Sequence, residues 1–494
     1  MNRIVFCCFA SALLPTLAHA KSLALPYPLD ATPVFADEPF RATQPPPGPV
    51  KQVASPKPVV FALANGIAVV LVERHQLPTV SLQLELPGGG ALDPVGKEGR
   101  ASVCTQLWGD GTAKLDKLQL AEALADLGSS VGASAATEDT TFELATLSRN
   151  LFPTLNLFAD VLLQPGLRAD ELGRIVARRK AALVAAKGNP SQLAGRLFAS
   201  VAYGPAHPRG RTVTEASLQS LTIDDCKAWA SGHGSVGATL YIVGDMSRAQ
   251  VEAELGGRMA LLPAKGYPVA AFGPPQPAPG KLFVAEVAGA EQSVVVVLHP
   301  GPARQAADFD ASAVMTSILS SGFSSRINQN IREKKGWAYG AGGNFGYTKE
   351  GSVLAIQAAV RADATGPSVA EILREMAEMR TAPPTAEELE REKQGAMLSL
   401  PARWATGRSI LGTFQSLRYY GLPLDDFDRY VARVQTVDAQ AVQAAATAHV
   451  QPGSAQVLIV GDPAKIKVQI EALLADGPLK GAVVVRLDGD GKRL

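Results

Sequence analysis

The stretch TLYIVGD at residues 239–245 resembles QVLIVGD at residues 456–462, and the two share the ending IVGD. Each run is apolar and ends in Gly-Asp, which is typical of a buried strand followed by a turn. Strand-like runs also open both halves of the chain, at residues 59–72 and 281–299. These correspondences predict an internal duplication of one α/β unit.

The length agrees with two domains, because 494 residues exceed the roughly 250–300 at which one hydrophobic core stops growing. A Pro-rich break around Pro274-Pro275 predicts a linker between the halves. Strand and helix patterns alternate, and turn pairs such as Asn65-Gly66 indicate hairpins. We therefore expect an α+β fold in which each domain has a largely antiparallel sheet flanked by helices.

The first twenty residues predict a secretory signal peptide. Arg3 supplies a positive start, residues 4–14 are apolar, and Ala18-His19-Ala20 is a small-x-small cleavage site. The apolar run is shorter than the roughly twenty residues that a membrane span needs, although an uncleaved anchor remains the alternative. We expect cleavage after Ala20, export to the periplasm and no membrane span.

The expected organisation has six parts. They are a signal peptide at 1–20, a Pro-rich arm at 21–58, an N-terminal domain at 59–263, a linker at 264–280, a C-terminal domain at 281–482 and a tail at 483–494.

The composition excludes some functions and leaves others open. Lys plus Arg (47) nearly equals Asp plus Glu (46), which argues against general nucleic-acid binding. Beyond the signal peptide, Cys104 and Cys226 either form one disulfide or remain two buried thiols. The sequence has no Gly-x-Ser-x-Gly nucleophile elbow. No two of the five remaining histidines are four residues apart, so no helix face presents a histidine pair; they are His75, His207, His233, His299 and His449.

The segment GRASVCTQLWGDGT at residues 99–112 resembles the motif helix of the pitrilysin-type zinc metallopeptidases, and the resemblance extends from about residue 59 to about residue 474. Active members of that family read Gly-x-Ala-His-x-x-Glu-His-x-x-x-x-Gly-Thr. In this chain Ser102 and Gln106 stand in place of the zinc-binding histidines, and Thr105 stands in place of the general-base glutamate. The family's third ligand is a Glu on a downstream helix, which corresponds here to residues 171–187 and has no acid after Glu171.

Hydroxyl and amide groups hold Zn²⁺ poorly compared with imidazole and carboxylate. The basic run at residues 178–180 would also repel a cation. We therefore expect that this chain binds no catalytic zinc or other metal of its own.

A second motif, SGFSSRINQNIREKKGWAYG at residues 321–340, resembles the family's Ser-Ser-Arg-Leu…Leu-Arg-Glu-x-x-Gly-x-Ala-Tyr segment. In that family an Arg and a Tyr reach from the second domain into the zinc site of the first. The resemblance assigns these roles to Arg332, as a planar donor for a peptide carbonyl, and to Tyr339, as a donor to an oxyanion. The alternative is that Arg332 caps a helix and Tyr339 packs at the start of a strand. The resemblance also implies substrate contacts for Ser324, Ser325, Ala133, Ser134 and Ala135.

Some members of this family divide the metal and the Arg/Tyr segment between two chains, as in the mitochondrial processing peptidase and in paired bacterial proteins. The resemblance therefore implies two homologous α/β-roll domains that form half of a clam-shaped chamber. It implies an exported subunit that is inactive alone, with zinc held by a partner that has an intact His-x-x-Glu-His motif. Peptide substrates would add as a strand to a sheet edge.

Two alternatives remain open. The first is a non-catalytic binding or scaffold protein of the same fold, like the core subunits of respiratory complexes. The second is a hydrolase that uses Cys104 as its nucleophile.

Overall fold

The computed structural model describes residues 39–43, 45, 48–49, 54–269, 271–275 and 281–494. The predicted signal peptide and much of the predicted arm lie outside these residues. Residues 1–49 form one unit, in which the described part contains a 3-10 turn, η1 (Pro39–Ala42). The chain from Val50 onward forms the other unit. Its described residues 54–269 are called the first half below, and residues 281–494 the second half.

The first half contains a six-stranded sheet in the order β1-β2-β6-β3-β5-β4. The strand β6, which is the TLYIVGD run, is buried at every position and pairs with β2 and β3. Strands β2 and β6 run parallel, and the other neighbours in the described sheet run antiparallel. The strands are β1 (Val59–Ala62), β2 (Ala68–Glu73), β3 (Thr79–Pro87), β4 (Ser130–Ala135), β5 (Asp139–Leu147) and β6 (Thr239–Gly244).

The second half repeats this plan in the order β12-β7-β11-β8-β10-β9. The QVLIVGD run forms β11, which takes the central place that β6 has in the first sheet, so the predicted duplication is confirmed. The strands are β7 (Lys281–Glu286), β8 (Gln292–Gly301), β9 (Ala338–Tyr347), β10 (Ser352–Arg361), β11 (Gln456–Gly461) and β12 (Val483–Leu487).

The two sheets differ at one edge. In the first sheet β1 forms an antiparallel pair with β2, whereas in the second sheet β12 runs parallel to β7. Residues 483–487, which the sequence assigns to a tail, thus form a strand. The run VVVRL is rich in β-branched residues that suit a strand.

Helices flank each sheet, as predicted. Those of the first half are α1 (Arg100–Gly109), α2 (Lys117–Asp126), α3 (Leu151–Leu163), α4 (Ala169–Lys187), α5 (Pro190–Tyr203), α6 (Glu215–Gln219), α7 (Ile223–Gly232) and α8 (Arg248–Met259). Those of the second half are α9 (Phe309–Thr316), α10 (Arg326–Asn328), α11 (Thr365–Thr381), α12 (Ala386–Leu398), α13 (Gly407–Tyr419), α14 (Tyr430–Thr436), α15 (Ala439–His449) and α16 (Pro463–Ala475), with π-helical turns at η5 (Ser317–Ser321) and η6 (Gln329–Lys334).

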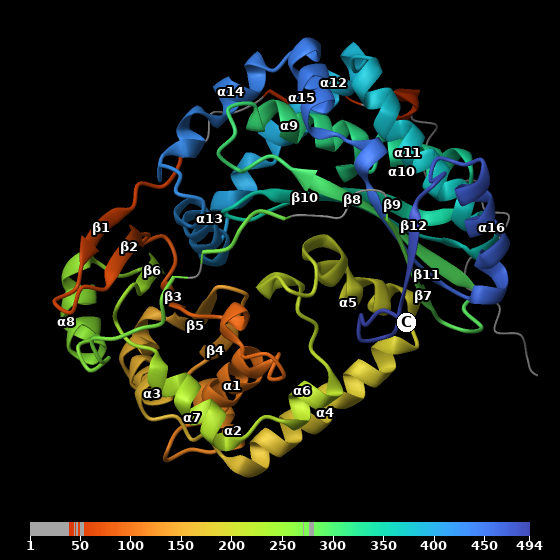
Figure 1. Ribbon diagram of the computed structural model, residues 1–494. Coiled ribbons are helices and arrows are strands. Elements are labelled where there is room, and N and C mark those ends of the chain that lie inside the picture. Colours follow the sequence, from red (N-terminus) through yellow and green to blue (C-terminus); the bar gives the residue numbers. More distant parts are fainter. Residues whose placement is uncertain (1–38, 44, 46–47, 50–53, 270, 276–280) are drawn as a thin grey trace, which may run out of the picture. The chain divides into compact units, whose positions relative to one another are not determined.

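Each sheet also packs against a helix from the other half (Figure 1). Leu193 and Leu197 of α5, in the first half, share an apolar cluster with strands β7, β8 and β11. Ile410 and Phe414 of α13, in the second half, share a cluster with strands β2 and β6. This exchange ties the two halves together, because neither sheet buries both faces with its own helices alone.

We expect Phe414→Ala to lower the free energy of unfolding by about 3–5 kcal/mol, because this side chain is 1% exposed and its removal leaves a cavity on the first sheet. Urea unfolding measures the effect. Leu398→Ala on α12 is the matched control, since Leu398 is 44% exposed, and should change the unfolding free energy by less than about 0.5 kcal/mol. Equal small effects from both variants would contradict the packing of α13 described here.

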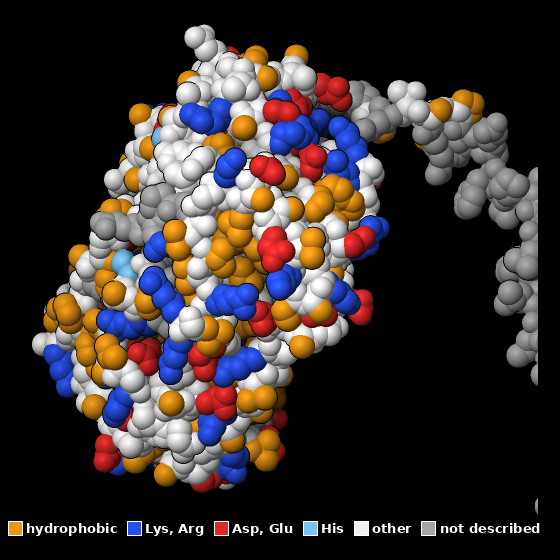
Figure 2. Space-filling view, turned by 45° about the vertical axis from the view of Figure 1, so that its right-hand side comes forward, with side chains coloured by type: hydrophobic (Ala, Val, Ile, Leu, Met, Phe, Trp, Pro, Cys, Tyr) orange, Lys and Arg blue, Asp and Glu red, His pale blue; other side chains and the backbone are white. Residues whose placement is uncertain are grey.

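Within the described part of the chain, no helix is both long enough and apolar enough to cross a membrane. On the face seen in Figure 2, acidic and basic side chains are interspersed.

Candidate functional site

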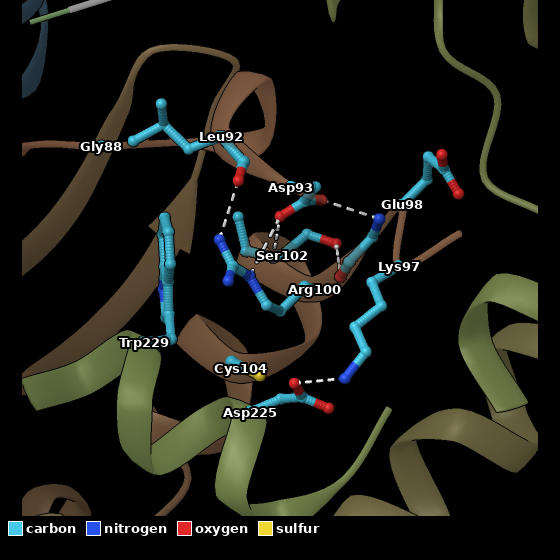
Figure 3. A network of polar contacts seen from close by, with 12 residues as sticks. Gly88, Leu92, Asp93, Lys97, Glu98, Arg100, Ser102, Cys104, Asp225 and Trp229 are labelled. Atoms are coloured by element: carbon cyan, nitrogen blue, oxygen red, sulfur yellow. Dashed lines mark hydrogen bonds and ion pairs between the residues drawn. The ribbon is translucent and has the colours of Figure 1, made fainter. Parts of the chain in front are cut away.

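The buried carboxylate of Asp93 binds the first turn of helix α1, which carries the degenerate zinc motif (Figure 3). Asp93 accepts the backbone N–H groups of Gly99 and Ala101, both at 2.8 Å. Gly99 has φ 96°, and a Cβ there would lie 3.1 Å from a methyl of Val213, so glycine suits this position. Burial raises the pKa of Asp93 to about 6, although the two N–H groups and Arg100 oppose the shift.

We expect Asp93 to make the protein less stable as the pH rises. Because its folded pKa of about 6 lies above the unfolded value, the folded state holds the proton more tightly. The contribution of Asp93 to the free energy of unfolding should therefore fall by on the order of 2–3 kcal/mol between about pH 4 and about pH 6. Urea titrations at several pH values measure this slope. Asp93→Asn, which does not titrate, should flatten it, and an unchanged slope would refute the assignment.

Ser102 and Gln106, the two positions that carry histidines in active relatives, are bridged by an arginine of α4. Nη1 of Arg179 donates to Oγ of Ser102 at 3.1 Å, and Nη2 donates to Oε1 of Gln106 at 2.9 Å. Burial lowers the pKa of Arg179, and the charge of Arg178 lowers it further. A guanidinium cation therefore lies against the residues that would face a metal. The basic run is evident in the sequence, but this bridge is not.

Thr105, the position of the general base, faces the interior. Its side chain is fully buried, and its Oγ1 accepts the indole N–H of Trp229 on α7 at 2.9 Å. The Trp229 ring also lies beside the guanidinium of Arg100 (Figure 3), and the guanidinium carbon is 4.9 Å from the ring centre. This hydroxyl thus supports packing between α1 and α7.

Cys104 and Cys226 form a disulfide that joins α1 to α7 across 122 residues of sequence. The sequence left this pairing open. Because a disulfide sulfur has no thiolate, the reading of Cys104 as a nucleophile is wrong.

The residues around α1 do not fit a metal. The hydroxyl of Ser102 and the amide of Gln106 are weak ligands for Zn²⁺. Their oxygens already accept hydrogen bonds from Arg179. No group of three or more His, Cys, Asp and Glu side chains that could hold a metal ion occurs in the residues that the structure describes.

Arg332 and Tyr339 lie together on the surface of the second half. Arg332 is on the π-helical turn η6, a type of turn that is frequent at functional sites. Its guanidinium carbon lies 5.3 Å from the ring centre of Tyr339, on the edge strand β9. It also lies 4.6 Å from the ring centre of Phe323. Tyr339 is 91% exposed and Phe323 is 64% exposed, so the two aromatic rings and the cation form a surface cluster.

Phe323 was not predicted as part of this cluster. An apolar aromatic side chain between Gly322 and Ser324 was the available signal, but only the fold shows that it is exposed and stacked on Arg332. We call Phe323, Arg332 and Tyr339 the Arg/Tyr cluster.

Asn328 holds the two sides of this cluster together. Its side chain is 4% exposed, its Nδ2 donates to the carbonyl of Phe323 at 2.7 Å, and its Oδ1 accepts the N–H of Ala341 on β9 at 3.1 Å. One buried amide thereby fixes the turn before α10 relative to the edge strand.

The other predicted substrate contacts are distributed over two places. Ser324 is exposed next to the cluster, whereas Ser325 is fully buried. Residues 133–135 lie on β4, the edge strand of the first sheet, where Ser134 is exposed and its two neighbours are half-buried. In the described part of the chain, no hydrogen bond, ion pair or ring contact joins Arg332 or Tyr339 to α1.

Comparisons with known proteins agree with this architecture. A sequence profile described as Insulinase (Peptidase family M16) matches residues 68–205, and one described as Peptidase M16 inactive domain matches residues 233–396. A non-peptidase homologue of Helicobacter pylori is 24% identical over 409 residues, which cover 81% of this chain and 93% of that protein.

Two crystal structures share the fold. A peptidase M16 inactive domain of Pseudomonas fluorescens is 26% identical with a TM-score of 0.75, and the match covers 82% of this chain and 98% of that one. A protease of Helicobacter pylori is 19% identical with a TM-score of 0.75, covering 83% of this chain and 100% of that one. With both halves matched, the chain belongs to peptidase family M16, and its motif helix carries no zinc ligands.

Proposed function

We propose that this protein is the zinc-less subunit of an exported heteromeric metallopeptidase. The observation that carries the proposal is the exposure of the Arg/Tyr cluster. A phenol that is 91% exposed beside a guanidinium adds little to the core, and such a pair offers hydrogen-bond donors to a bound molecule.

In the proposed assembly, a related partner subunit with an intact His-x-x-Glu-His motif holds the zinc. Zinc held there would supply an activated water, and the partner's glutamate would accept a proton from that water. Arg332 donates to a peptide carbonyl, and the hydroxyl of Tyr339 donates to the oxygen of the scissile carbonyl as negative charge develops. The two chains face each other as the halves of a chamber.

Peptide substrates are proposed to pair with the edge strand β4, along Ala133, Ser134 and Ala135. Strand addition uses main-chain hydrogen bonds, and an edge strand provides free donors and acceptors. Ser324, which is exposed beside the Arg/Tyr cluster, is proposed as a further peptide contact, and Ser325 as a residue that shapes the same turn.

Export to the periplasm, with cleavage after Ala20, forms part of the proposal. The Cys104–Cys226 disulfide supports it, because disulfides persist in oxidising compartments.

A non-catalytic binding or scaffold role is the second candidate. The Arg179 bridge fits both candidates, since each leaves α1 without a metal site. The scaffold role is favoured by the name of the Helicobacter pylori relative, a non-peptidase homologue.

Cleavage of a quenched peptide tests the two candidates. The assay compares this chain alone, a candidate His-x-x-Glu-His partner alone and their mixture, with zinc present. The proposal predicts activity that appears or rises sharply only in the mixture and falls with Arg332→Ala. A mixture no more active than the partner alone would favour the scaffold role.

A further inference from the structure

A cleft of about 600 Å³ lies between the two halves. Its volume is within the range of ligand pockets in proteins. Part of the lining is apolar and comes from α5, β7 and β12, through Val201, Phe283 and Leu487. These three residues are buried members of one apolar cluster, and we call them the apolar floor of the cleft.

Four cationic side chains line the same cleft: Arg211, Lys281, Lys492 and Arg493. Among the described residues, none of these four has a carboxylate within ion-pair distance. Nη1 of Arg211 donates to the backbone carbonyl of Asp93 at 2.8 Å. The four side chains therefore bring positive charge to the cleft that no ion pair offsets.

Two carboxylates also line the cleft, and both already have partners. Asp490 accepts from Lys187 at 2.9 Å and from Arg196 at 3.0 Å, so two further cations offset its charge. Glu98 accepts the backbone N–H of Gly96 at 3.0 Å. The cations thus outnumber the carboxylates, and the surplus charge lies above an apolar floor.

A smaller cleft of about 320 Å³ connects this region to the motif helix. The two clefts share Glu98 and Arg211, and the smaller one also includes Ser102 of α1 and Ala135 at the end of β4. A peptide paired with β4 would leave the strand at Ala135 and reach Arg211 next. This path of the peptide rests on the proposed function.

We propose that this cleft, called the basic cleft, binds an acidic segment of a peptide. The carboxylates of the segment face Arg211, Lys281, Lys492 and Arg493, and its apolar side chains lie on the floor. The site would give the subunit a preference for peptides with acidic residues beyond the segment that pairs with β4.

Fluorescence anisotropy with the purified chain alone tests the proposal. The probes are a labelled peptide of alternating Glu and Val and a matched peptide with Gln for Glu. The test variant is Lys281→Gln/Lys492→Gln/Arg493→Gln. The control variant, Lys227→Gln/Arg429→Gln/Lys480→Gln, loses the same charge at exposed positions that do not line the cleft.

We expect the acidic peptide to bind the cleft variant at least about tenfold more weakly than the unaltered chain at low salt, and the control variant within about twofold. The Gln peptide should bind all three proteins weakly. Equal losses in both variants would show a general effect of net charge and overturn the proposal. Equal binding of the Glu and Gln peptides would also overturn it.

This result is independent of peptide cleavage, because the assay contains no partner and no zinc. An inactive mixture with intact binding of the acidic peptide would refute the proposed function and leave the basic cleft standing. An active mixture without binding of the acidic peptide would refute the basic cleft and leave the proposed function standing.

Discussion

Tyr339→Phe is expected to lower the kcat of the proposed two-subunit peptidase by about 10²–10³-fold while changing KM little, as removal of an oxyanion donor does. The substitution removes only the phenolic O–H. The ring, which stacks on Arg332 with 5.3 Å between the guanidinium carbon and the ring centre, stays in place. Substrate binding should therefore persist while transition-state stabilisation is lost. Steady-state cleavage of a quenched peptide by the mixture measures both constants.

Tyr203→Phe on α5 is the matched control for this prediction. It removes a phenolic O–H from a half-buried tyrosine outside the Arg/Tyr cluster, and we expect kcat to stay within about twofold. If Tyr339→Phe also stayed within that range, Tyr339 would have no role as an oxyanion donor.

Removal of the disulfide should lower the stability of the fold strongly. We expect Cys104→Ala/Cys226→Ala to lower the free energy of unfolding by about 4 kcal/mol, because the bond closes a loop of 122 residues and so restrains the unfolded chain. Both cysteines are fully buried, so lost packing adds to the effect. Urea unfolding of the variant and the unaltered protein measures the difference.

Reduction of the unaltered protein separates the cross-link from the packing. Unfolding in the presence of reductant keeps both sulfur atoms but breaks the bond, and it should reproduce most of the loss. The same denaturation midpoint in oxidised and reduced protein would show that the bond does not stabilise the fold.

Much of the fold was predictable because the central strands are buried on both faces. The runs that form β6 and β11 are largely apolar and share the ending Ile-Val-Gly, which revealed the duplication. Strand β12 was not predicted. It lies at a sheet edge, and the first half has no strand at the corresponding place in its sequence. The exchange of α5 and α13 was also missed, since an amphipathic pattern shows that a helix has a buried face but not which sheet covers it.

The candidate site was predictable where chemistry follows from residue type. Ser102, Thr105 and Gln106 are poor metal ligands whatever their surroundings. The bridge from Arg179 depends on how α4 packs against α1, across 77 residues of sequence, and residue type alone carries no such information. The pairing of Cys104 with Cys226 depended on the same kind of long-range packing, here between α1 and α7.

Photo-cross-linking from position 339 tests the central claim most directly. Tyr339 is replaced by benzoylphenylalanine, and the partner carries a Gln for the glutamate of its His-x-x-Glu-His motif, so that it binds peptide without cleaving it. The account predicts a cross-link between position 339 and the peptide that forms only when the partner is present. A cross-link of equal yield without the partner, or none in the mixture, would contradict the claim that Tyr339 reaches the partner's zinc site.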